Sequence, residues 1–198
     1  VSYHAEVMDL MELGVDSVMV VHGGGMYGDK QATMERWCGQ YRELPAKVRR
    51  RLVLENCEKC FSIADCLWVS SNIGIPVVMD SHHHDCYQKL HPGEKLECGG
   101  FYMKDVLETW TKRGIKPKVH VSEQGEGRCG HHSDYINELP GYFLEIPKKY
   151  RIGIDIMIEA KMKEKAIARL YRKYGQRVMP PIKRTAKRKY KLTIVDRL

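Results

Sequence analysis

The chain has 198 residues, of which 43% are hydrophobic and 29% are charged, and this length and composition suit one globular domain with a single core. No run approaches the ~20 apolar residues of a membrane helix, and the first residues lack the basic start and apolar core of a signal peptide. We therefore expect a soluble intracellular monomer without a membrane partner, in either the nucleus or the cytoplasm. Seven irregularly spaced cysteines predict reduced thiols rather than a disulfide framework.

Short apolar segments alternate with segments of helical periodicity along most of the chain. The expected strands are residues 16–21, 51–54, 75–79, 117–122 and 152–158. The expected helices are residues 5–14, 30–51 with a break near Pro45, 61–72, 101–113 and 164–173, with a further helix starting near 131–135 and a longer loop at 87–100. Because the strands are apolar throughout rather than alternating, the pattern favours a parallel sheet covered by helices.

Each expected strand reaches a polar residue near its carboxyl end. These residues are His22, Glu55, Asp80, His120 and Glu159. In a closed parallel barrel the carboxyl ends of the strands converge on one face, where the active site is built. Imidazole and carboxylate groups are ligands for divalent metals, so the sequence predicts a metal site on that face.

The segment 77–85 (VVMDSHHHD) runs from apolar residues directly into a carboxylate and three imidazoles. A histidine-rich surface loop is the alternative reading of such a triplet. His82 would share a face with Asp80 if the strand continued, whereas His83 would do so if the chain turned there, and the pattern does not decide between them.

Lys118 precedes His120 by two residues, so both side chains point to the same side of their strand. A lysine is unexpected among metal ligands because cations repel one another. Its amine would either contact a substrate phosphate or be held neutral or modified to an anion.

The formal net charge is +8, and the excess is concentrated after Lys161. Within the end of the chain, residues 183–191 (KRTAKRKYK) carry six basic residues and no acid. Such a segment adds nonspecific affinity for DNA, or is a nuclear-import-type or merely solvated tail. The candidate DNA contacts are Lys183, Arg184, Lys187, Arg188 and Lys189.

Seven short motifs resemble those of the UV damage endonuclease family, in the same order and at comparable spacing. They are HGGG at 22–25, YGDK at 27–30, LEN at 54–56, MDSHHH at 79–84, KVHVS at 118–122, HSDY at 132–135 and DIMIEAK at 155–161. The resemblance implies a TIM-type barrel related to endonuclease IV and xylose isomerase. It also implies a centre of up to three divalent metals and an enzyme that nicks damaged double-stranded DNA immediately 5′ to ultraviolet photoproducts.

Carried over motif by motif, the resemblance implies seven metal ligands and three catalytic residues. The metal ligands are His22, Glu55, Asp80, His83, His120, His132 and Glu159, and the catalytic residues are Lys118, Glu159 and Asp80. Mixed imidazole and carboxylate ligands favour Mn²⁺, with Zn²⁺ or Mg²⁺ as alternatives. The chain departs from the family at Cys57 and Glu58, where acidic residues are common, and no segment resembles the family's N-terminal part.

Five predicted strands compare with the eight of a closed barrel. We therefore expect an α/β protein with about five of eight β/α units: residues 1–175 as a partial metal-dependent TIM-barrel nuclease domain, and residues 176–198 as a basic C-terminal tail. The alternatives are an abasic-site endonuclease, a barrel similar to the sugar isomerases, and a degenerate barrel that binds DNA or protein without catalysis.

Overall fold

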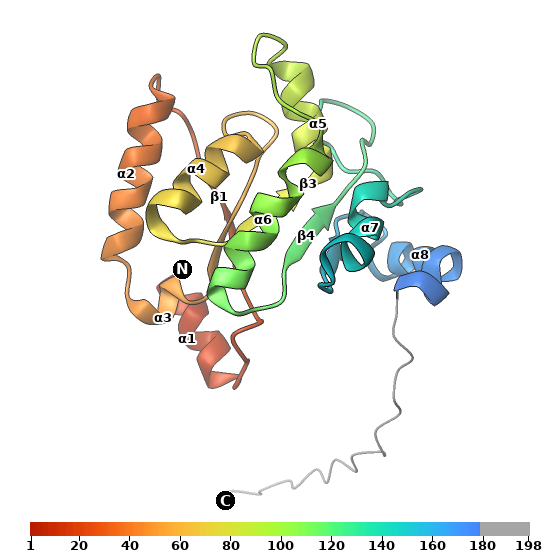
Figure 1. Cartoon of the computed structure of the whole chain (residues 1–198), viewed down its shortest axis with the longest axis horizontal. Helices are drawn as coiled ribbons and strands as arrows, with labels where there is room; N and C mark the ends of the chain where they lie inside the picture. The colour runs from red at the N-terminus through yellow and green to blue at the C-terminus, as the bar shows by residue number, and fades with distance from the viewer. Residues whose placement is uncertain (179–198) are drawn as a thin grey trace, which may run out of the picture.

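The computed structural model describes residues 1–178 and contains one parallel sheet with helices between its strands (Figure 1). The strands are β1 (Met19–His22), β2 (Leu52–Glu55), β3 (Val77–Asp80), β4 (Lys118–Val121) and β5 (Asp155–Ile158). The helices are α1 (Ser2–Leu10), α2 (Lys30–Glu43), α3 (Ala46–Arg49), α4 (Ile63–Ile73), α5 (Ser81–Leu90), α6 (Gly99–Arg113), α7 (Gly141–Tyr150) and α8 (Lys163–Val178).

The order of the strands in the sheet is the order of the strands in the chain, β1-β2-β3-β4-β5. Every neighbouring pair is parallel, and the register aligns His22 with Glu55 and Asp80 with His120. A doubly wound sheet would reverse its strand order at an internal point, whereas a β/α barrel adds each strand beside the last. The topology therefore confirms the predicted α/β fold of the barrel type.

Helices α2, α4, α6 and α7 follow one another along one side of the sheet in Figure 1, and each contacts the next. The core lies between these helices and the strands. Trp110 of α6 is fully buried and donates a hydrogen bond from Nε1 to the Val77 carbonyl at 2.7 Å, which fixes α6 against β3. The apolar character of β2, β3 and β4 is thus explained by burial along their whole length, whereas β1 and β5 are only partly buried.

Local signals in the sequence set several helix ends. Ser62 and Asp65 form a capping box at the start of α4, each side chain accepting from the backbone N–H of the other residue. Gly74 and Gly114 end α4 and α6 in the left-handed conformation, with φ of 71° and 73°. These caps return the chain to the start of the next strand without a long connection.

Two predictions of local structure are wrong. Residues 87–100 are not one long loop, because α5 continues to Leu90 and α6 begins at Gly99. No helix starts near residues 131–135; the next helix is α7, which begins at Gly141. The predicted tail, residues 176–198, lies mostly outside the described residues, which end within α8 at Val178. None of the helices described here is long and apolar enough to cross a membrane.

Candidate metal centre

The carboxyl ends of the five strands bring together all seven side chains that the sequence nominates as metal ligands. They form three overlapping groups whose ligand atoms lie within 4.8 Å of one another: His22, Glu55 and His83; Glu55, Asp80, His120 and Glu159; and His83, His132 and Glu159. Every strand supplies a ligand at its end or directly after it. Glu55, His83 and Glu159 each belong to two groups, so the arrangement has the form of a centre with shared ligands.

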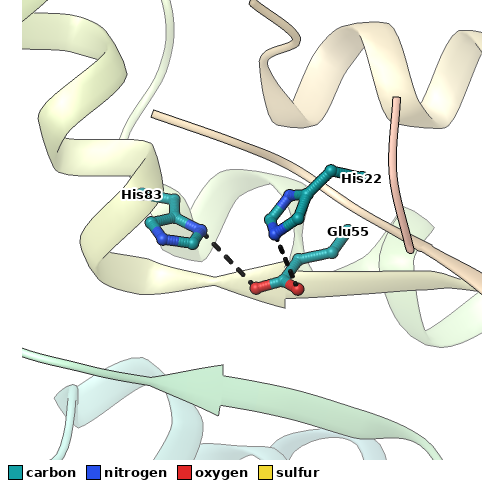
Figure 2. A group of neighbouring side chains, drawn as sticks. All are labelled: His22, Glu55 and His83. Carbon is teal, nitrogen blue, oxygen red and sulfur yellow. Dashed lines mark ion pairs between the residues drawn. The ribbon is translucent and has the colours of Figure 1, made fainter. Parts of the chain in front are cut away.

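The first group joins β1, β2 and α5, and Figure 2 shows its two imidazoles on either side of one carboxylate. His22 Nε2 lies 3.5 Å from Glu55 Oε2, and His83 Nδ1 lies 3.5 Å from Glu55 Oε1. Glu55 is 2% exposed, whereas almost half of the His22 side chain is accessible. A side chain at Gly23, directly after His22, would come within 2.6 Å of the Phe61 ring, so a glycine is needed where β1 ends.

The second group is the most deeply buried and contains three carboxylates. His120 Nδ1 lies 2.9 Å from Glu55 Oε1 and 3.0 Å from Glu159 Oε1. A single imidazole nitrogen has at most one proton to donate, so it cannot satisfy both oxygens fully. Asp80 is completely buried beside these groups, and burial raises its pKa because a buried carboxylate is costly in its charged form. A cation among the three carboxylates would meet this deficit.

The third group adds His132, which comes from the connection after β4 rather than from a strand. His132 Nε2 lies 3.5 Å from Glu159 Oε2, and its ring centroid is 6.0 Å from that of His83. An isolated bridge between Gln124 and His132 holds the connection closed. Gly125 is required there, because a Cβ atom would collide with the His132 backbone.

The donor set and its dimensions fit divalent metals. Ligand bonds of about 2.0–2.2 Å from nitrogen or oxygen place two ligands of one ion at most ~4.4 Å apart. The groups need only a small contraction from their 4.8 Å limit to meet that geometry. Nitrogen and carboxylate oxygen together suit Mn²⁺ or Zn²⁺ chemistry. The residues present therefore fit the metal centre that the sequence predicts.

Asp80 decides which histidine of the triplet enters the centre. It caps α5, since Asp80 Oδ1 accepts from the backbone N–H of His83 at 2.8 Å. The chain therefore turns into a helix directly after β3, and His83 faces Glu55. Among residues 1–178, His82 and His84 belong to none of the three groups. The ring of His82 lies against Cys86, and His84 Nε2 lies 3.0 Å from the Glu97 carbonyl.

Asn56 is the last residue of the LEN motif and is a positioning residue that the sequence analysis does not nominate for the site. It is fully buried, its Oδ1 accepts from the Asp80 backbone N–H at 2.9 Å, and its Nδ2 donates to the Asp80 carbonyl at 3.1 Å. The side chain thus clamps the end of β3 to the end of β2. A buried amide directly after a ligand carboxylate is the sequence signal that could have identified this role.

Lys118 is not brought together with the ligand groups. Its ammonium lies at the opposite, amino-terminal end of the sheet, 3.1 Å from Asp155 Oδ2 and 3.5 Å from Asp16 Oδ1. Lys118 and His120 do share one face of β4, but they are two positions apart, which is about 7 Å along the strand. A catalytic role for Lys118 stays a prediction, and the five candidate DNA contacts in residues 183–189 lie outside the described residues.

Mutual contacts set the protonation of the centre. Burial opposes the charged form of Glu55, but hydrogen bonds with His120 and His83 prevail and lower the pKa of Glu55 to about 2. Burial also opposes protonation of the imidazoles, yet Glu159 and Glu55 raise the pKa of His120 to about 10, and Glu55 and Asp80 raise the pKa of His83 to about 9. A metal bound at this site would therefore displace protons from histidine.

Parallel β/α units in chain order, with ligand residues converging at the strand ends, define an α/β protein of the TIM-barrel class with a candidate polynuclear metal centre. Comparison with known sequences gives a family within that class. The chain belongs to the UV-endonuclease UvdE family, whose sequence profile matches residues 1–189. This finding confirms the resemblance seen in the sequence motifs.

Individual relatives agree with this assignment. A protein of Acanthamoeba polyphaga mimivirus is 38% identical over 174 residues, covering 86% of this chain and 51% of the relative. The UV DNA damage endonuclease of Bacillus cereus is 34% identical over 171 residues, covering 85% and 52%. The crystal structure of SacUVDE superimposes with a TM-score of 0.71 at 30% identity, covering 88% of this chain and 57% of that one. The chain spans about half the length of the curated relatives it matches.

Proposed function

We propose that this chain carries the metal-binding face of a DNA repair endonuclease that hydrolyses a phosphodiester bond immediately 5′ to ultraviolet photoproducts in double-stranded DNA. The observation that carries the proposal is the convergence of seven ligand-type side chains at the strand ends of a chain in the UV-endonuclease UvdE family. Up to three divalent ions, with Mn²⁺ as the expected metal, match the three overlapping groups.

The candidate ligands would have different roles in such a centre. Bound divalent ions activate water and neutralise charge on a phosphoryl group and its leaving oxygen. Glu55, Glu159 and the buried Asp80 would supply carboxylate ligands to the ions, and Glu55 and Glu159 each belong to two of the three groups. The partly accessible His22, His132 and Glu159 lie at the solvent side, where a phosphodiester would approach.

DNA is the proposed partner and a monomer the proposed state. The basic segment 183–191 would add sequence-independent affinity through phosphate contacts. A photoproduct stacks and pairs poorly, so bending the duplex and rotating the lesion out of the stack costs less than for undamaged DNA. Lys118 could act only if its amine left Asp155 and Asp16.

A cleavage assay separates the proposal from its rivals. The 198-residue chain with Mn²⁺ is given end-labelled duplexes that contain one thymine dimer, one abasic site or no lesion, and the position of any nick is mapped. We expect a nick 5′ to the dimer and none with Asp80→Asn, because the amide cannot replace the anion. Preferential cleavage at the abasic site would favour an abasic-site endonuclease. Turnover of an aldose without cleavage of DNA would favour an isomerase.

A further inference from the structure

The ammonium of Lys30 forms a polar junction between three helices. Lys30 Nζ donates to Asp65 Oδ2 at 2.9 Å and to the Tyr87 hydroxyl at 2.7 Å, and it lies 3.4 Å from Glu94 Oε2. Tyr87 is fully buried and donates its own hydroxyl proton to the Glu94 carboxylate, with the oxygens 3.0 Å apart. The junction therefore joins the first residue of α2, the third residue of α4 and the second half of α5.

These three helices belong to the three β/α units that supply the first ligand group. His22 ends β1, and the connection after it leads to Lys30; Glu55 ends β2 ahead of α4; and His83 lies in α5 itself. Tyr87 follows His83 by four residues, so both side chains lie on one face of α5. One ammonium thus contacts all three units whose ligands must meet around one ion.

Both main partners of the ammonium are themselves held in place. Asp65 belongs to the capping box of α4, where its Oδ2 accepts from the Ser62 N–H and hydroxyl at 2.8 Å each. The Tyr87 ring stacks on the ring of His91, with centroids 4.0 Å apart. Burial opposes the charged form of Lys30, but the hydrogen bonds with Tyr87 and Asp65 prevail and raise its pKa, so the ammonium stays charged at neutral pH.

The junction supplies a link between α2 and α5 that other contacts do not duplicate. Helix α2 packs directly against α4. Among residues 1–178, the bond from Lys30 to Tyr87 is the sole side-chain hydrogen bond between α2 and α5. A partly buried network of charged and phenolic groups favours one arrangement, because moving one member leaves another without its partner.

We propose that Lys30 is a positioning residue for the ion of the first ligand group. The rings of His22 and His83 lie 5.5 Å apart on either side of Glu55, and a small shift of α5 would carry His83 beyond the reach of an ion bound by the other two. The inference rests on the proposed function, because it concerns one ion of that centre. Partners behind the direct ligands change metal affinity by about 10–100-fold, and for a residue that acts through a helix we expect about 10-fold.

The test is a calorimetric titration of the 198-residue chain with Mn²⁺, which gives the number and affinity of bound ions, with urea unfolding of the metal-free protein measured separately. In Lys30→Met we expect one ion to bind about 10-fold more weakly and the others to bind as in the parent chain. Tyr87→Phe removes only the oxygen that joins Lys30 to α5, so it should reproduce this loss even if Lys30→Met folds poorly. Lys30→Arg keeps a charged donor and should recover most of the affinity.

A double variant identifies which ion depends on Lys30. In a chain that carries His22→Ala, Lys30→Met should cause no further loss, because the ion that it supports is already weakened. The matched control is Lys116→Met, which removes an ion pair with Asp155 and should bind Mn²⁺ as the parent chain does. Unchanged affinity in Lys30→Met or Tyr87→Phe, equal weakening of every ion, no recovery in Lys30→Arg, or a loss that adds to that of His22→Ala would each overturn the inference. A parent chain that binds no Mn²⁺ would instead overturn the proposed metal centre itself.

Discussion

Asn56→Ala tests whether the buried amide clamps the end of β3. The substitution deprives the Asp80 N–H and the Asp80 carbonyl of their partners at 2.9 and 3.1 Å, in a site with no exposed area on Asn56. Each buried group left without a partner costs ~1–3 kcal/mol, so we expect a loss of about 3 kcal/mol in the free energy of unfolding. At ~2–4 °C per kcal/mol for a chain of this size, the melting temperature should fall by about 6–12 °C.

Urea unfolding followed by circular dichroism measures this loss in the metal-free protein. The matched control is Asn72→Ala, which removes an exposed amide that donates to the Trp68 carbonyl at 2.8 Å and should change stability by less than ~0.5 kcal/mol. Mn²⁺ binding to Asn56→Ala, measured by calorimetry, should weaken as well, because Asp80 loses its fixed position. If the free energy of unfolding fell no more in Asn56→Ala than in the control, the proposed stabilising role of the two Asn56 hydrogen bonds would be refuted.

Three other predictions concern charge. Glu55→Gln removes an anion from two ligand groups, so equilibrium dialysis should show an Mn²⁺ affinity lowered about 100-fold or more. The control Glu108→Gln changes an exposed surface carboxylate and should bind Mn²⁺ as the parent chain does. Equal affinities of the two variants would exclude Glu55 as a ligand. Because the folded pKa values of His83 and His120, about 9 and 10, exceed the ordinary 6.5, their protonation stabilises the metal-free fold fully below pH 6.5. That stabilisation should be lost as pH rises through 9–10, while Mn²⁺ affinity increases over the same range; pH-independent Mn²⁺ titrations would contradict this. Deleting residues 183–191 should weaken binding to damaged and undamaged duplexes equally and flatten its salt dependence, and an unchanged slope would leave the segment without a role in binding.

The strands and their terminal ligands could be predicted because both depend on local information. An apolar run followed by His22, Glu55 or Asp80 predicts a strand that ends at a polar site, and the strands that end at Glu55 and Asp80 are buried along their whole length. The local pattern left His82 and His83 as alternatives, and the choice of His83 came from the family resemblance. An aspartate that accepts from the backbone three residues later starts a helix, and this capping pattern is present in the segment 80–83.

The remaining features depend on residues far away in the sequence. The direction of Lys118 is set by Asp155 and Asp16, which come from other strands or their approaches. His132 reaches the centre because the connection after β4 closes on itself through the bridge to Gln124, not because a helix begins there. No periodicity reports such long-range pairings, so the sequence could name His132 but could not say how it is held.

The consecutive strand order has a consequence for cooperativity. Each β/α unit contacts mainly the units before and after it, as in a linear array, so the units at the two edges could open without disturbing the middle. The ligand groups cut across this array, because the second group alone draws on β2, β3, β4 and the end of β5. An ion held there would bind only when all four units are folded together. Metal occupancy would then couple these four β/α units into one cooperative unit of unfolding.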